Sequence, residues 1–438
     1  MFATTRSSCR HLGIRCLATE SAAHTPIPPP LPPLPPQHNP DTSLKPRASH
    51  LYPRPRTRTR SPATPSNHRD TLPQLPLSFG RNQLLPVPNS TRALLEQIVA
   101  SFEAPIRYAF AYGSGVFEQA GYDAPGEGPV IQGAQGAQTQ DSPMLDFVFA
   151  VNHPDHWHSI NMHQFPGHYP LHARMLGSSF VARTQALGPG LWFNTFVPMH
   201  GVTIKYGVTT VDTLCADLLN WRTLYLAGRM HKPLRIIKDD ARVRLTQQVN
   251  LTSALRTALL TLPSTFTTRE LFARIAGISY AGDPRMLLPA ENRGKISNIV
   301  TRQEEQFREL YWRLAHGLPG VRWAADASAV EQDISPHARA AHLKKLPQGL
   351  LCRVHERMAG RGPAREADET AYWLRIAGDE TLPTVLHEEM SKIVRYPATV
   401  QSLKGIVSAG VVKSARYTTA KVGKWWKGMR SGSGESTS

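Results

Sequence analysis

A proline-rich segment near the start of the chain limits where folding can begin. Residues 26–88 hold 18 of the 37 prolines in the 438-residue sequence. Proline removes a backbone donor and fixes φ, so such a segment cannot propagate a helix or a central strand. We expect a disordered, extended linker over residues 26–88 and a folded part that begins near Ser90. An SH3-type ligand is the less favoured interpretation of the same prolines.

The residues before the linker have the composition of a targeting segment. Arg6, Arg10 and Arg15 stand among Ser, Thr and small apolar residues, and the first acidic residue is Glu20. Basic, acid-poor N-termini of this kind are typical of mitochondrial presequences. We predict a presequence over residues 1–25, with an ordinary disordered basic terminus as the alternative.

Composition excludes several classes of protein. The 41% hydrophobic content can fill a sizeable core, but no run of about 18 apolar residues is present, which argues against a transmembrane enzyme. The four cysteines form no Cys-x-x-Cys pair, so a disulfide framework or a thiolate zinc site is not expected. Of the net charge of +17, residues 1–70 carry +7 and residues 398–438 carry +6, which leaves only +4 between them. No nucleic-acid partner is therefore expected.

Apolar patterning divides the folded part in two. It predicts a helix from Ser90 and strands over 108–112, 144–151, 202–206 and 234–237, together with a helix that has Leu214, Leu218, Trp221 and Tyr225 on one face. From about residue 244 the pattern becomes helical, and Thr267 with Glu270 and Thr301 with Glu304 fit capping boxes. We predict an α+β fold, with one domain over 89–240 and a helical domain over 241–390.

A small-residue turn follows the first predicted strand. Gly113, Ser114 and Gly115 let backbone N–H groups and a hydroxyl approach a phosphate closely. A simple tight turn is the alternative interpretation of these three residues.

One carboxylate interrupts the second predicted strand. Asp146 stands in an otherwise apolar run, and a buried strand does not carry an unpaired charge. A divalent cation such as Mg²⁺ would compensate this charge, and a basic side chain at the rim of the sheet would do so equally. A Gly-Ser-Gly loop followed by an acidic strand is the order expected of polymerase-beta-type nucleotidyltransferases.

Many further segments resemble one family in the same order. They are residues 112–117 with Gln119, 144–149, 157–161, 204–208, 217–221, 227–229 with Lys232 and Pro233, 279–283 with Arg285, 298–300, 393–395 and 404–406. Over about residues 90–430 the chain resembles the mitochondrial phosphatidate cytidylyltransferases of the translocator assembly and maintenance family.

The resemblance implies a fold and an activity. The fold is a polymerase-beta-type nucleotidyltransferase domain, a winged-helix-like helical domain and a C-terminal amphipathic helix. The activity is transfer of CMP from CTP to phosphatidic acid, giving CDP-diacylglycerol and pyrophosphate for cardiolipin biosynthesis on the matrix side of the mitochondrial inner membrane.

The resemblance also implies roles for residues. Asp146, Lys205 and Lys232 would be catalytic, with Mg²⁺ or another divalent cation on Asp146. The residues that would bind the nucleotide and its phosphates are Gly113, Ser114, Gly115, Gln119, Tyr206 and Arg229. Some members carry an acidic pair after the Asp146 strand where this chain has Asn152 and His153, so a second carboxylate ligand is not identified.

Several residues keep two interpretations. Asp217, among the apolar positions of a predicted helix, is either a structural partner or catalytic. Five histidines, His153, His156, His158, His163 and His168, have spacings that could bind zinc, although polar contacts near an anionic substrate are the simpler interpretation. Ser279, Tyr280, Asp283, Arg285 and Lys295 either bind the lipid phosphate or fix a contact between domains.

The C-terminal region differs in kind from the rest. Residues 404–430 contain seven basic residues and no acidic ones, and apolar residues recur there at three- and four-residue steps. This pattern predicts an amphipathic helix over 391–430 that lies on an anionic membrane surface, before a disordered tail over 431–438. Its membrane contacts would be Lys413, Arg416, Lys421, Lys424, Trp425 and Trp426. A helix packed on the domain through its apolar face is the alternative.

A second function class stays open beside the enzyme. A non-catalytic assembly and maintenance factor for the mitochondrial translocator would also carry a presequence and a membrane helix. The sequence is compatible with an oligomer as well.

Overall fold

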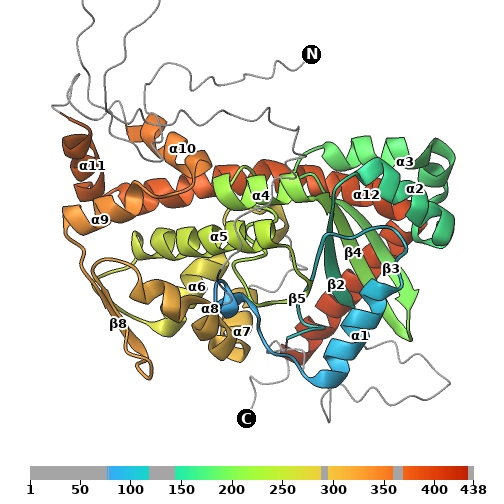
Figure 1. The fold of residues 1–438 in the computed structure, drawn as a ribbon, viewed down its shortest axis with the longest axis horizontal. Helices are drawn as coiled ribbons and strands as arrows, with labels where there is room; N and C mark the ends of the chain where they lie inside the picture. Colours follow the sequence, from blue (N-terminus) through green and yellow to red (C-terminus); the bar gives the residue numbers. More distant parts are fainter. Residues whose placement is uncertain (1–75, 77, 118–143, 288–293, 359–367, 433–438) are drawn as a thin grey trace, which may run out of the picture. The chain divides into compact units, whose positions relative to one another are not determined.

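The computed structural model describes residue 76 and residues 78–117, 144–287, 294–358 and 368–432, with side chains described as far as residue 408 in the last range. Within these residues the protein is a mixed α/β fold (Figure 1). The predicted presequence, the linker as far as residue 75, Gln119 and the residues after 432 lie outside this description.

A five-stranded sheet organises the first half of the described chain. Its strands are β1 (Tyr108–Tyr112), β2 (Leu145–Val151), β3 (Trp192–Met199), β4 (Val202–Thr210) and β5 (Leu234–Lys238), in the spatial order β3-β4-β2-β1-β5. β2 and β4 are parallel, and the other neighbouring strands are antiparallel. The middle strand β2 is therefore paired along both of its edges.

Most of these strands form where the apolar patterning predicts them. β1 and β2 are almost fully buried, which explains why their sequences read as continuous apolar runs. β4 continues to Thr210, beyond the predicted end at residue 206. The patterning does not predict β3, because Asn194 and Pro198 interrupt its apolar residues.

Four helices and two 3-10 turns accompany the sheet. They are η1 (Arg81–Gln83), α1 (Asn89–Ala100), α2 (Pro154–Gln164), η2 (Pro166–His168), α3 (Leu171–Ala186) and α4 (Val211–Asn220). α1 begins one residue before the predicted Ser90. Figure 1 shows α2 and α3 next to each other beside β3 and β4.

Helix α4 is shorter than the patterning predicts. It ends at Asn220, and Trp221 has a left-handed backbone with φ of 51°. The prediction that Trp221 and Tyr225 continue the helical face is therefore wrong. The cause is Asp217, whose carboxylate binds the backbone of the following turn, as described below.

The second half is mainly helical, as predicted, and contains a small additional sheet. Its helices are α5 (Ala241–Leu259), α6 (Thr268–Gly277), α7 (Lys295–Arg302), α8 (Glu304–His316), α9 (Pro336–Leu343), α10 (Gln348–Met358) and α11 (Glu369–Gly378), with the 3-10 turn η3 (Pro284–Leu287). The strands β6 (Thr265–Thr267), β7 (Val321–Arg322) and β8 (Ala329–Gln332) form a sheet in the order β6-β8-β7.

One of the two predicted capping boxes is confirmed. Thr267 accepts a hydrogen bond from the backbone N–H of Glu270, and the Glu270 side chain accepts one from Thr267 in return. The box at Thr301 and Glu304 is wrong, because α7 runs through Thr301 and the residue before α8 is Gln303.

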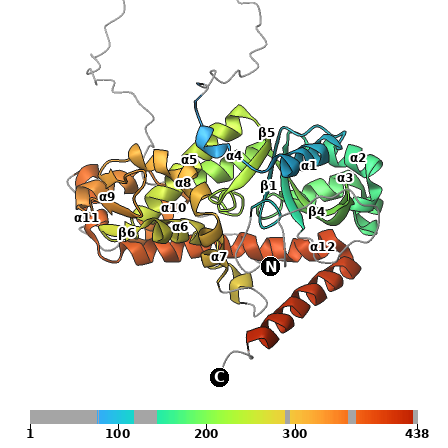
Figure 2. The same cartoon turned by 90° about the horizontal axis from the view of Figure 1, so that it is seen from below.

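The chain then forms α12 (Leu382–Gly432), which contains Pro397 and which Figure 2 shows as two straight stretches that meet at an angle. The predicted amphipathic region over 391–430 lies within it. The backbone from Lys413 to Trp426 is helical, whereas the side chains of the predicted membrane contacts lie outside the described part of the structure. Every described helix is too short or too polar to cross a lipid bilayer.

The end of the predicted linker belongs to the folded part. Leu85 is buried in the apolar core, Asn82 donates a hydrogen bond to the carbonyl of Leu310, and Gln83 donates one to the carbonyl of Arg244. The predicted linker boundary at residue 88 is therefore too late, since two buried amide side chains attach residues 82 and 83 to α5 and α8.

Candidate functional site

Three candidate side chains lie in one row across the sheet. Tyr112 pairs with Asp146, and Asp146 pairs with Lys205. Paired residues point to the same face, so the row brings the phenol, the carboxylate and the ammonium together. Lys205 Nζ lies 3.2 Å from Asp146 Oδ1 and 4.5 Å from the centre of the Phe193 ring. The carboxylate thus has a basic partner, which is the second of its two predicted compensations.

The Gly-Ser-Gly loop turns directly against this carboxylate. Gly113 follows β1 with φ of +89°, and a Cβ added there would lie 3.5 Å from Asp146 Oδ2. A Cβ on Gly115 would lie 2.7 Å from Leu145 Cδ2 and 3.1 Å from the Met144 carbonyl. The positive φ favours glycine at position 113, and the nearby Met144 carbonyl leaves little room for a side chain at position 115.

The surroundings of Asp146 fit a divalent cation held largely by substrate. Its Oδ1 atom is buried and, although Lys205 pairs with it, accepts no hydrogen bond from the described residues. No described group of three His, Cys, Asp or Glu side chains could hold a metal ion without further ligands. Mg²⁺ is commonly bound by one or two carboxylates together with phosphate oxygens and water, and Asp146 supplies one such carboxylate.

Asp217 is a structural residue that organises the turn after α4. Its Oδ1 accepts hydrogen bonds from the N–H groups of Thr223 and Leu224 and from the Thr223 hydroxyl, at 2.7, 3.1 and 2.9 Å. Its Oδ2 accepts from the N–H groups of Leu226 and Ala227, at 3.0 and 3.1 Å. The carboxylate is buried, and both of its oxygens accept hydrogen bonds from this turn, so the structural interpretation of Asp217 is correct.

This turn delivers Arg229 to the row of Tyr112, Asp146 and Lys205. The guanidinium lies 3.9 Å from the centre of the Tyr225 ring and 5.9 Å from that of Tyr112, and it donates a 2.7 Å hydrogen bond to the Tyr225 carbonyl. Burial lowers the pKa of Arg229, but Tyr225 and Tyr112 outweigh it and raise the pKa overall. Arg229 is thus a permanent cation with a fixed orientation.

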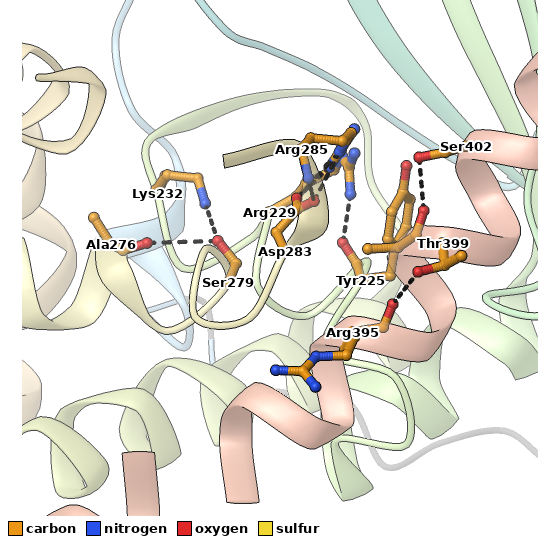
Figure 3. A network of polar contacts seen from close by, with 11 residues as sticks. Tyr225, Arg229, Lys232, Ala276, Ser279, Asp283, Arg285, Arg395, Thr399 and Ser402 are labelled. Atoms are coloured by element: carbon orange, nitrogen blue, oxygen red, sulfur yellow. Dashed lines mark hydrogen bonds and ion pairs between the residues drawn. The ribbon is translucent and has the colours of Figure 1, made fainter. Parts of the chain in front are cut away.

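Lys232 brings a second cation from the same turn. Its Nζ donates a hydrogen bond to the Gly228 carbonyl at 2.7 Å. It donates another to the Ser279 hydroxyl at 2.8 Å, which Figure 3 shows. The Tyr280 ring centre lies 4.9 Å from Lys232 Nζ and 5.5 Å from Lys295 Nζ. Burial, Arg229 and Lys295 together hold the pKa of Lys232 well below its usual value.

The 279–285 segment adds one ion pair. Arg285 forms a bidentate contact with the buried Asp283, with a shortest distance of 2.6 Å. Burial raises the pKa of Asp283, but the contacts from Arg285 lower it below its usual value overall. Figure 3 shows this pair close to Arg229 and beside α12.

Basic side chains outnumber carboxylates among the described residues that have just been named. They are the basic side chains of Lys205, Arg229, Lys232, Arg285 and Lys295 against the carboxylates of Asp146 and Asp283. Like charges held in a partly buried cluster raise the free energy of the empty protein. A polyanion such as a triphosphate would relieve this repulsion.

Tyr206 does not belong to the site. It neighbours Lys205 on β4, so its side chain points to the opposite face of the sheet. It is fully buried, and its hydroxyl hydrogen-bonds with Asn161 and His168. The prediction that Tyr206 contacts nucleotide is therefore wrong.

The histidine segment has a structural role where it is buried. His158 hydrogen-bonds with Tyr169 and Gln185, and His168 stacks on Phe165. Burial of these rings among aromatic partners supports polar packing instead of a zinc site.

Sequence patterning missed the two tyrosines that hold Arg229. The pattern predicts Tyr225 on a helix that in fact ends earlier, and it indicates Tyr112 only as the end of a strand. The pairing of Tyr112 with Asp146 follows from strand register, which a single sequence does not give.

Comparison with known proteins gives a consistent result. A family model described as mitochondrial phosphatidate cytidylyltransferase matches residues 95–424. A protein of that name from Xenopus laevis is 38% identical over 80% of this chain and 99% of its own length. Those from Schizosaccharomyces pombe and Saccharomyces cerevisiae are 35% and 39% identical, each over 81% of this chain and over 88% and 76% of their own lengths.

Proposed function

Because this chain belongs to the mitochondrial phosphatidate cytidylyltransferase family, we infer that it is a nucleotidyltransferase that transfers CMP from CTP to phosphatidate. The products are CDP-diacylglycerol and pyrophosphate. The observation that carries the assignment of the site is a group of basic side chains that begins with Lys205 beside Asp146 and the Gly113–Gly115 loop and continues through Arg229 to Lys232.

The reaction moves negative charge, and these residues are suited to follow it. An oxygen of the phosphatidate phosphate attacks the α-phosphorus of CTP, and the bond to the β-phosphate breaks as pyrophosphate leaves. Lys205, Arg229 and Lys232 stabilise the charge on the transferring and leaving phosphates. The attacking oxygen is already anionic, so the reaction needs no general base.

The loop and the carboxylate complete the proposed site. Gly113, Ser114 and Gly115 bind the triphosphate through backbone N–H groups and the serine hydroxyl. Asp146 would hold a divalent cation, which would neutralise phosphate charge. The pKa of Lys232 is depressed in the protein without substrate. A phosphate that binds beside Lys232 favours its protonated form, because opposite charges attract.

The finer fold and the location are part of the proposal. The mixed sheet with Asp146 on its middle strand supports a polymerase-beta-type nucleotidyltransferase domain, and the β6-β8-β7 sheet among helices supports a winged-helix-like second part. We place the enzyme on the matrix side of the inner membrane, attached peripherally through α12.

A direct assay tests the function and the site together. The full chain would be mixed with radiolabelled CTP, Mg²⁺ and phosphatidate liposomes, beside Asp146→Asn and the control Asp212→Asn. Asp212 is an exposed carboxylate on α4 whose side chain is 81% accessible. We expect labelled CDP-diacylglycerol from the parent and the control, and about 100-fold less from Asp146→Asn.

Two outcomes would contradict the proposal in different ways. Full activity of Asp146→Asn would show that the site is misassigned. A parent protein that is folded but makes no product would refute the enzymatic function. The non-catalytic assembly factor would then be the remaining hypothesis.

A further inference from the structure

Exposed apolar side chains are concentrated on two connected elements. Among the described residues, twelve large apolar side chains are exposed, and eight of them lie on α3, on the residue after it, or on α12. These eight are Leu171, Met175, Leu176, Leu187, Tyr396, Leu403, Ile406 and Val407. Apolar exposure gathered in one part of a surface usually marks an interaction site.

Helix α3 is apolar on the side where a surface helix is normally polar. α3 is kinked at Gly177, where φ is 81°. Ala173 before the kink and Val181 after it pack against Trp192. On the outer side of α3 Leu171, Met175 and Leu176 are 67%, 79% and 59% exposed. An amphipathic surface helix needs only one apolar face, so this second apolar surface is not required for folding.

Lysine 404 joins α3 to α12. Lys404 Nζ donates hydrogen bonds to the carbonyls of Gln185 at 3.1 Å and Leu187 at 2.7 Å, where the end of α3 attracts a cation. Lys404 is only 5% exposed, so this basic residue of the predicted membrane region faces the protein. On a face of α12 that adjoins Lys404, Tyr396, Leu403 and Val407 are exposed at steps of seven and four residues, which places them in one stripe.

The charge around both elements favours an anionic partner. No acidic residue occurs from 156 to 211 or from 390 to 434. Arg174 and Arg183 on α3 and Arg395 on α12 are exposed. Two copies of the chain meeting through α3 would bring these cations together without a carboxylate between them, whereas an anionic lipid surface attracts them.

We propose that α3 is a second membrane-contacting element, which inserts Leu171, Met175 and Leu176 into an anionic bilayer surface beside α12. The choice of lipid as partner rests on the proposed function, because phosphatidate is a membrane lipid. α3 and α12 then attach the nucleotidyltransferase sheet to the membrane at two connected places.

Vesicle binding tests the proposal with a matched control. The full chain would be sedimented with phosphatidylcholine vesicles, with and without phosphatidic acid, beside the triple variant Leu171→Ser, Met175→Ser and Leu176→Ser. The control carries Leu84→Ser, Val249→Ser and Ile334→Ser, three exposed apolar residues elsewhere. We expect the α3 variant to bind phosphatidate vesicles about 10-fold more weakly and the control to bind like the parent.

Activity in detergent micelles separates this proposal from the function. The α3 variant should turn over phosphatidate in micelles like the parent. If the α3 variant binds vesicles more weakly but the parent is inactive, the proposed function is refuted and the membrane contact of α3 is supported. Unchanged vesicle binding would overturn the proposal, as would a parent that is dimeric in solution and becomes monomeric in the α3 variant.

Discussion

Lys205 Nζ lies 3.2 Å from Asp146 Oδ1 across the parallel strands β2 and β4, and both side chains are mostly buried. The pair neutralises a carboxylate that a buried strand would otherwise not tolerate. It also presents a cation and a carboxylate together beside the Gly113–Gly115 loop. A substrate phosphate and its cation could therefore each find an opposite charge in one place.

Removing the cation from this pair should affect activity and stability together. In Lys205→Met we expect kcat/KM for CTP to fall about 100-fold, because a cation that stabilises phosphate charge is lost. The free energy of unfolding should fall by about 1–3 kcal/mol, since Asp146 keeps its burial without its partner. Product assays and urea denaturation measure the two effects. Lys205→Arg should recover most of the stability, and a Met variant as active as the parent would exclude Lys205 from the mechanism.

The turn held by Asp217 should matter through Arg229 and Lys232. In Asp217→Asn the new amide would face backbone N–H groups, so we expect a loss of about 2–4 kcal/mol in the free energy of unfolding. Below the unfolding temperature kcat should also fall, because both cations follow this turn. Asp212→Asn on the same helix is the control, with an expected change within about 0.5 kcal/mol. Equal stability of the two variants would contradict the role of Asp217.

The sequence predicts the parts of the fold that depend on local pattern. β1 and β2 are continuous apolar runs, and Thr267 with Glu270 forms its capping box from residues three apart. The pattern does not predict the end of α4, because Asp217 binds the backbone of residues 223–227. A carboxylate bonded to backbone N–H groups leaves no pattern in the side chains that could reveal it.

The candidate site shows the same division. Asp146 is visible as a charge inside an apolar strand, and Gly113 as the residue after a strand. Successive side chains on a strand point to opposite faces, so Lys205 and Tyr206 cannot both face the site. This alternation is visible in the sequence and argues against Tyr206 as a nucleotide contact. The contact between Lys232 and Ser279 joins residues 47 positions apart, and it depends on tertiary packing.

Close packing of the loop predicts a cost for the smallest side chain. In Gly115→Ala the new methyl group would meet Leu145 Cδ2 at 2.7 Å, so we expect a loss of about 1–3 kcal/mol in the free energy of unfolding. Gly405→Ala in α12 is the opposite case, because nothing lies within 4 Å of the added atom. There we expect a gain of about 0.5–1 kcal/mol from helix propensity. Thermal melting of both variants checks the contrast, and a neutral Gly115→Ala would show that the loop can move away from β2.

Buried histidine should make the protein sensitive to acid. Burial lowers the pKa of His158 from 6.5 to about 4, although its hydrogen bond with Gln185 raises it. The unfolded chain therefore binds a proton between pH 6.5 and 4 that the folded chain does not, so the stabilisation is complete above pH 6.5 and is lost as the pH falls toward 4. We expect His158 to account for a loss of about 3 kcal/mol in the free energy of unfolding between pH 7 and pH 4.

Burial lowers the pKa of His231 as well, to about 3, so a second contribution should persist when His158 is replaced. Urea denaturation at several pH values, with His158→Gln beside the parent, measures the difference. The variant should lose less stability on acidification than the parent, and parallel pH profiles would show that His158 becomes charged without unfolding the protein.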